Sequence, residues 1–158
     1  MSKEYDSYRS FLKEIQDPTL KTRAELSLKY YIDQAVLYKR LWQILSVSGI
    51  VLPALATVFA SINGDRFNTA VIIITACTTV ITGVLAFLKC ADKKNSYRNS
   101  AENLKSELCA YASGQGIYAE NPREKDAILF KRMESIIKEG YQKIEALEKD
   151  KEKETGAV

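Results

Sequence analysis

Two long stretches without a charged residue constrain the fold of this chain more than any other feature. Residues 41–64 contain no Asp, Glu, Lys or Arg, residues 67–88 contain none either, and only Asp65 and Arg66 separate the two stretches. As helices they would be about 36 and 33 Å long, against a bilayer hydrocarbon core of roughly 30 Å. The sequence therefore predicts two membrane-spanning helices.

The segment between the two stretches favours a tight turn. Residues 63–66 read Asn-Gly-Asp-Arg, in which Gly64 allows the chain to leave one helix, and either Asp65 or Asn68 is able to cap the next. We therefore expect a helical hairpin. The alternative is a hairpin buried in the core of a soluble bundle, but such a core helix needs less apolar length than these stretches have.

Basic residues on the flanks predict the orientation of this hairpin. Lys and Arg are frequent on both outer sides of the two stretches, whereas the connecting turn contains only Arg66. Basic residues are retained on the cytoplasmic side of a membrane. Both chain termini are therefore expected in the cytoplasm, where the three cysteines would stay reduced.

The soluble segments predict helices, so the expected fold class is all-α: a membrane hairpin (41–64 and 67–88) with a cytoplasmic bundle of N- and C-terminal helices. Residues 1–40 predict helices, the second of them capped by Thr19 and continuing into the first span. Residues 89–150 predict an unbroken extension of the second span to about Ser113, a loop at 114–126 and a final helix. Residues 151–158 are expected to be a disordered tail. The final helix carries an apolar stripe that needs a partner: Leu129, Met133, Ile136, Ile137, Ile144 and Leu147.

Composition excludes several classes of function. The chain has no His, which removes histidine acid–base chemistry and histidine metal ligation. Its 23 basic and 20 acidic residues form no strongly basic segment, which argues against nucleic-acid binding. Three cysteines in no CxxC spacing indicate neither a disulfide framework nor a zinc site. We expect no catalytic site, no metal and no cofactor, and therefore not an enzyme.

Each predicted span has one face of small or weakly polar residues. Either these faces pack against each other, because small residues let membrane helices approach closely, or one of them lines a water-filled pathway. A single hairpin cannot enclose a pore, so a pathway requires a homo-oligomer. Pro53 removes one backbone hydrogen bond and produces either a static kink or a hinge. The candidate residues are Ser46, Gly49, Pro53, Thr57 and Ser61 in the first span and Thr75, Thr78, Thr79 and Thr82 in the second.

The segment after the second span resembles a known family. With the aromatic-rich first helix and the hairpin, it is similar to the SLATT family of bacterial two-transmembrane effectors over roughly residues 20–145. The residues that carry the resemblance are Tyr97, Arg98, Ala101, Glu102, Leu104 and Glu107, followed by Tyr118 in the loop. The resemblance implies an anti-phage effector that permeabilises the bacterial inner membrane, with a nucleotide-signal synthase or sensor protein as partner. It implies no catalytic residues.

These observations lead to one expected function and one alternative. We expect an oligomeric inner-membrane effector, whose partners are the lipid bilayer and further copies of itself and whose trigger acts through the cytoplasmic helices. The alternative is a non-conducting membrane-anchored adaptor, in which the stripe from Leu129 to Leu147 docks a cytoplasmic sensor or enzyme. The absence of ionisable residues from both spans argues against an energised transporter.

Overall fold

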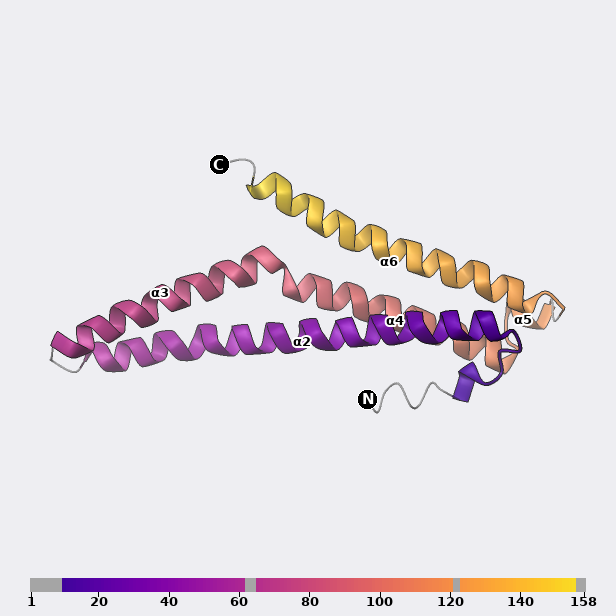
Figure 1. Cartoon of the computed structure of the whole chain (residues 1–158), viewed down its shortest axis with the longest axis horizontal. Helices are drawn as coiled ribbons and strands as arrows, with labels where there is room; N and C mark the ends of the chain where they lie inside the picture. Colours follow the sequence, from indigo (N-terminus) through magenta and orange to yellow (C-terminus); the bar gives the residue numbers. More distant parts are fainter. Residues whose placement is uncertain (1–9, 62–64, 121–122, 156–158) are drawn as a thin grey trace. The chain divides into compact units, whose positions relative to one another are not determined.

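The computed structural model describes residues 10–61, 65–120 and 123–155, which are almost entirely helical and contain no strand (Figure 1). The all-α prediction is therefore confirmed. Apart from a helical turn at residues 10–12, the described helices are α2 (Pro18–Ala60), α3 (Asp65–Leu88), α4 (Cys90–Ser113), α5 (Ile117–Glu120) and α6 (Lys125–Thr155).

The chain divides into two compact units. One consists of Leu37–Asp92, which holds the apolar part of α2 and all of α3. The other consists of Met1–Val36 together with Lys93–Val158, and it is a bundle of helices from both ends of the chain. We refer to them as the apolar unit and the bundle.

Helix α2 belongs to both units, because it runs without a break through 43 residues. The predicted continuation of the N-terminal helix into the first apolar stretch is thus confirmed, and the helix also passes through Pro53. Its cap differs from the prediction: the carboxylate of Asp17 accepts the backbone N–H groups of Thr19 (2.7 Å) and Leu20 (3.4 Å). Asp17 caps the helix, and Pro18 occupies the first helical position, where a missing N–H costs nothing.

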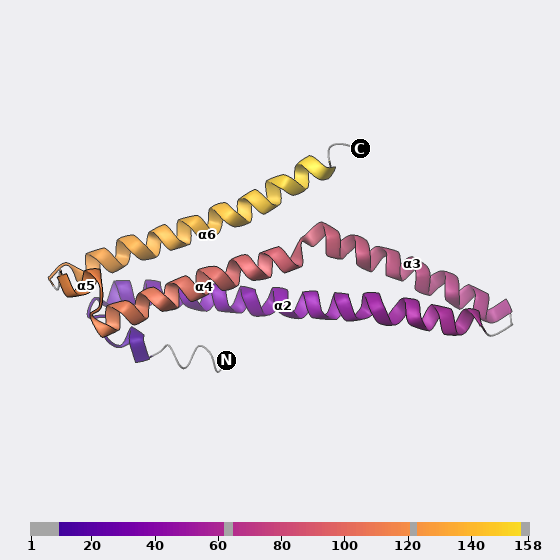
Figure 2. The ribbon, with the colours of Figure 1, turned by 180° about the vertical axis from the view of Figure 1, so that it is seen from behind.

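The predicted unbroken extension of the second span is wrong, because the helix is interrupted at Lys89 (Figure 2). This residue has a φ of 42°, which is left-handed backbone that non-glycine residues rarely adopt. The backbone bonds at the break, Lys89 N–H to Ala86 (3.4 Å) and Asp92 N–H to Lys89 (3.0 Å), span three residues instead of four. Helical periodicity is regular on both sides, so it could not reveal a single-residue break.

The bundle has one core, formed by the first half of α2, by α4 and by α6. The predicted apolar face of α2 is buried at Leu20, Ala24, Leu28 and Tyr31. The face of α4 that carries Leu104 and Leu108 is buried as well. Four residues of the predicted C-terminal stripe are also buried: Leu129, Met133, Ile137 and Ile144. The largest buried side chains of the bundle are Leu28, Tyr31, Leu104, Leu108, Tyr111, Leu129 and Met133.

Two predictions about the C-terminal segments need correction. Gly114 (φ 63°) ends α4, with its N–H bonded to Tyr111 O and that of Gln115 bonded to Ala110 O, the pattern of a Schellman cap. The expected loop at 114–126 then contains the short helix α5, and α6 begins at Lys125. Residues 151–155, expected to be disordered, are the last part of α6, since their alternating charges are compatible with a solvated helix. Residues 156–158 lie outside the described part of the chain.

Candidate functional site

The two apolar helices are long and apolar enough to cross a membrane, and their apolar windows contain no buried residue. Within the described part of residues 37–88, no side chain is buried. Ile50 is 74% exposed and Ile72 is 69% exposed. A soluble monomer rarely leaves an apolar surface of this size in water. These helices are therefore not core helices of the chain itself.

The threonine hydroxyls of α3 donate to carbonyl groups of their own helix. Thr75 donates to Val71 O (2.7 Å), Thr78 to Ile74 O (2.8 Å) and Thr79 to Thr75 O (3.0 Å). Thr82 reaches Thr78 O and Thr79 O. Each donor is satisfied without a second helix, while each oxygen keeps a lone pair that is able to accept a bond from water or a neighbouring chain.

The candidate face of α2 behaves in the same way at its polar positions. Thr57 donates to Ala54 O and Ser61 donates to Val58 O, both at 2.7 Å. Both residues are exposed, while Ser46, Gly49 and Pro53 are partly covered. A Cβ added at Gly49 would meet no atom within 4 Å, so no other helix of the chain approaches it closely.

The hairpin leaves most of the threonine stripe uncovered. Thr75, Thr79 and Thr82 are exposed, and Thr78 is partly buried. Any packing of this stripe therefore involves another molecule: lipid, water or a second copy of the chain.

The residues that resemble the SLATT motif divide into a buried and an exposed set. Tyr97, Ala101 and Leu104 are buried in the core of the bundle. The ring of Tyr97 lies 6.1 Å from that of Tyr30 and 6.2 Å from that of Tyr31, so α4 contacts α2 through an aromatic cluster. These three motif residues therefore position α4 in the bundle.

The charged residues of the motif form ion pairs along α4. Glu102 lies 3.6 Å from Arg98 and 3.2 Å from Lys105. The Lys105 side chain is only 4% exposed, so Glu102 compensates a nearly buried positive charge. Arg98 and Glu102 are on the solvated side of the helix, where such pairs contribute little to stability.

Glu107 and Tyr118, two motif residues on different helices, are hydrogen bonded. Tyr118 of α5 donates to the Glu107 carboxylate of α4 (2.5 Å), and Arg132 of α6 lies 3.4 Å from the other carboxylate oxygen. Burial, together with this bond to a carboxylate, raises the pKa of Tyr118 well above its ordinary value. One carboxylate therefore joins three helices.

A second tyrosine makes a similar tie that the sequence did not predict. Tyr111 donates to the carboxylate of Asp126, and the Lys125 ammonium lies 4.6 Å from the centre of the Tyr111 ring. Burial, and then the bond to Asp126, raise the pKa of Tyr111. The spacing of these residues gave no signal, because the contact depends on how α6 returns along α4.

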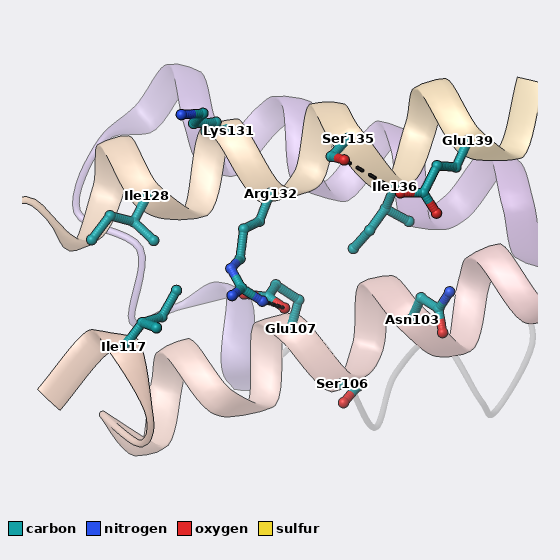
Figure 3. A pocket seen from close by; sticks show the side chains of 10 residues that line it. All are labelled: Asn103, Ser106, Glu107, Ile117, Ile128, Lys131, Arg132, Ser135, Ile136 and Glu139. Atoms are coloured by element: carbon teal, nitrogen blue, oxygen red, sulfur yellow. Dashed lines mark hydrogen bonds and ion pairs between the residues drawn. The ribbon is translucent and has the colours of Figure 1, made fainter.

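An open groove of about 750 Å³ lies between α4, α5 and α6 (Figure 3). Arg132 and Glu107 extend toward each other from its two sides. Its acidic side chains (Glu107 and Glu139) balance its basic ones (Lys131 and Arg132), so charge favours no class of ligand. The other lining residues are Asn103, Ser106, Ile117, Ile128, Ser135 and Ile136.

The described residues include no cluster of His, Cys, Asp or Glu able to hold a metal ion. Cys77, Cys90 and Cys109 are free thiols. Within the described residues, the tyrosine–carboxylate bonds and the Arg132–Glu107 ion pair act as ties between helices.

Fold and surface together define a helical protein with two exposed apolar helices of membrane-spanning length and a compact bundle. The family described as "Protein of unknown function (DUF4231)" matches residues 27–126, well over half of the chain. The chain belongs to this family, and the matched region contains the apolar part of α2 and all of α3, α4 and α5. No curated protein and no solved structure matches the chain.

Proposed function

We propose that the chain is an oligomeric effector of the bacterial inner membrane, with both termini in the cytoplasm, and that its assembled hairpins permeabilise the bilayer. The observation that carries the proposal is the uncovered threonine stripe on a helix of membrane-spanning length. Its hydroxyl donors are satisfied within α3, so the stripe tolerates lipid in one state and accepts water in another.

The biological role in this proposal comes from the resemblance to SLATT proteins. It supports a function in anti-phage defence, with a nucleotide-signal synthase or a sensor protein as the source of the trigger. The bundle is the part on which such a trigger acts, because it is the polar part of the chain and shares α2 with the apolar unit.

The adaptor function is less well supported, because its docking surface is occupied. Leu129 and Met133 are 0% exposed, and Ile137 and Ile144 are 8% exposed, within the chain's own bundle. A partner would have to displace α6 from the core to reach this stripe, at the cost of several buried side chains.

Two triple variants test the proposal by separating the polarity of the stripe from its shape. In one, Thr78, Thr79 and Thr82 are replaced by Val, which keeps the branched shape and removes the hydroxyl. In the other, the same residues are replaced by Ser, which keeps the hydroxyl and loses the methyl group. The measurements are dye release from liposomes containing purified protein and depolarisation of expressing cells.

If the stripe is wetted in the conducting state, the Val variant should lose leakage and the Ser variant should retain it. The reverse order would mean that the stripe acts through helix packing alone. Dye retention and full membrane potential with the wild-type chain, at every protein density tested, would refute the permeabilising function and leave a non-conducting anchor.

A further inference from the structure

Helix α2 carries a second apolar stripe that the chain leaves largely exposed; one of its members, Tyr30, is 39% exposed and also lies against Tyr97 of α4. In the bundle, one face of α2 is buried through Leu20, Ala24 and Leu28, but Leu26 on the opposite side is 63% exposed. Exposed apolar residues continue along this opposite side into the apolar unit. We call them the exposed stripe: Leu26, Tyr30, Leu37, Leu41, Ile44, Val51, Leu55 and Val58.

The spacing of the exposed stripe is that of a helix-pairing surface. Five of its residues recur at intervals of seven: Tyr30, Leu37, Ile44, Val51 and Val58. Leu41 and Leu55 each stand four residues after one of these five, as the alternate core positions of a heptad do. Because α2 is one unbroken helix from Pro18 to Ala60, the stripe keeps a single face throughout.

Lipid is unable to cover the whole exposed stripe. Tyr30 and Leu26 precede the first residue of the charge-free stretch by about 16 and 22 Å of helix. The headgroup layer on each side of the hydrocarbon core is only about 5–8 Å thick. These two positions therefore lie in water, where lipid does not reach the exposed Leu26 side chain or the exposed part of the Tyr30 ring.

We infer that the exposed stripe is the surface through which two copies of this chain pair, α2 against α2. An occupant of the full stripe must itself be a helix that passes from water into the membrane with a seven-residue apolar repeat. A second copy of α2 has this length and this repeat, whereas a soluble partner covers only the cytoplasmic end. The inference depends on the membrane insertion proposed above, but not on the formation of a pore.

Cysteine cross-linking in membranes tests this pairing. The background is the full-length chain with the exposed Cys77 and Cys109 replaced by Ala, and with the buried Cys90 retained. Single cysteines are then placed in the exposed stripe (Tyr30→Cys or Leu37→Cys). The matched control is Lys39→Cys, since Lys39 is exposed at almost the same depth as Leu37 but projects from the opposite side of α2.

Disulfide formation requires Cα atoms within about 7 Å, which facing stripe positions reach and residues on opposite sides of paired helices do not. We therefore expect the Tyr30→Cys and Leu37→Cys variants to form a disulfide-linked dimer on oxidation and the Lys39→Cys variant to stay monomeric. Equal cross-linking at all three positions would mean random collision and overturn the inference. So would dimer at none of them, or cross-links only to a different protein.

The outcomes for pairing and for permeabilisation are separable. Cross-linked dimer together with liposomes that retain their dye supports the pairing and refutes the permeabilising function. Leakage with an inserted protein that does not cross-link along the exposed stripe refutes the pairing alone. Failure of the chain to insert into membranes would overturn both.

Discussion

Gly140 gives the sharpest test of how the bundle is packed. A Cβ at this position in α6 would lie 2.8 Å from Ser100 Oγ and 2.8 Å from Tyr31 Oη, closer than side chains tolerate. The Ser100 hydroxyl is able to rotate away. Tyr31 is not, because its ring is 1% exposed and its hydroxyl donates to the Ile137 carbonyl at 3.3 Å.

The variant Gly140→Ala therefore sets a local gain against a larger loss. Alanine favours the helix interior by about 1 kcal/mol relative to glycine. Overpacking costs roughly 1–3 kcal/mol, and loss of the buried hydrogen bond to Ile137 costs about 1–3 kcal/mol more. We expect a net destabilisation on the order of 2–3 kcal/mol, seen as a lower melting temperature of the full chain in detergent.

A double variant and a glycine control identify the cause. With Tyr31→Phe in place the clashing oxygen is gone, so adding Gly140→Ala should cost much less than it does alone. Gly83→Ala should be neutral or mildly stabilising, because a Cβ at Gly83 meets nothing within 4 Å. Equal effects at Gly140 and Gly83, or strict additivity with Tyr31→Phe, would refute the close approach of α6 to α2.

Three further predictions concern pH, the helix break and the phase of α2. Burial raises the pKa of Tyr31 to about 12, so its contribution is complete below pH 10 and is lost as the pH rises from 10 to 12. Tyr31→Phe should reduce this alkaline loss of helix, followed by circular dichroism and tyrosinate absorbance. Lys89 has a left-handed backbone, which costs a residue with a side chain about 1 kcal/mol more than glycine. Lys89→Gly should therefore have a higher melting temperature than Lys89→Ala, and the opposite order would argue against the break. One alanine inserted after Val36 turns the rest of α2 by about 100°, so Tyr30→Cys and Leu37→Cys no longer share a face and only one of them should still cross-link. A seven-residue helical insertion should restore cross-linking at both positions.

The sequence predicts most of the helices because their determinants are local. The two apolar helices and the buried face of α2 follow from composition and periodicity over short windows. Asn63 and Gly64 of the predicted turn lie outside the described residues. The break at Lys89 escapes such reasoning, since one left-handed residue alters no apolar pattern. Asp17 caps α2 in place of the predicted Thr19. Both residue types are able to cap a helix, so the sequence alone does not distinguish them.

The ties between helices could not be predicted, because they depend on tertiary register. Glu107 meets Tyr118 and Arg132 only when α4, α5 and α6 are placed side by side. The contact of Tyr111 with Asp126 has the same origin. The Glu107 side chain is only 14% exposed, and nothing in the sequence of α4 distinguishes it from Glu102, whose side chain is 47% exposed.

The exposed stripe shows why periodicity alone does not identify an interface. In water, α2 has apolar residues on two sides, one through Leu28 and Tyr31 and the other through Leu26 and Tyr30, and either side could have been buried. Inside a membrane the contrast disappears, because lipid permits apolar residues on every side. Only the packing of α4 and α6 shows which side of α2 the chain covers itself. The other side stays largely exposed, with Leu26 63% exposed. Its seven-residue repeat then supports the pairing proposed above, since a second copy of α2 matches it in length and in phase.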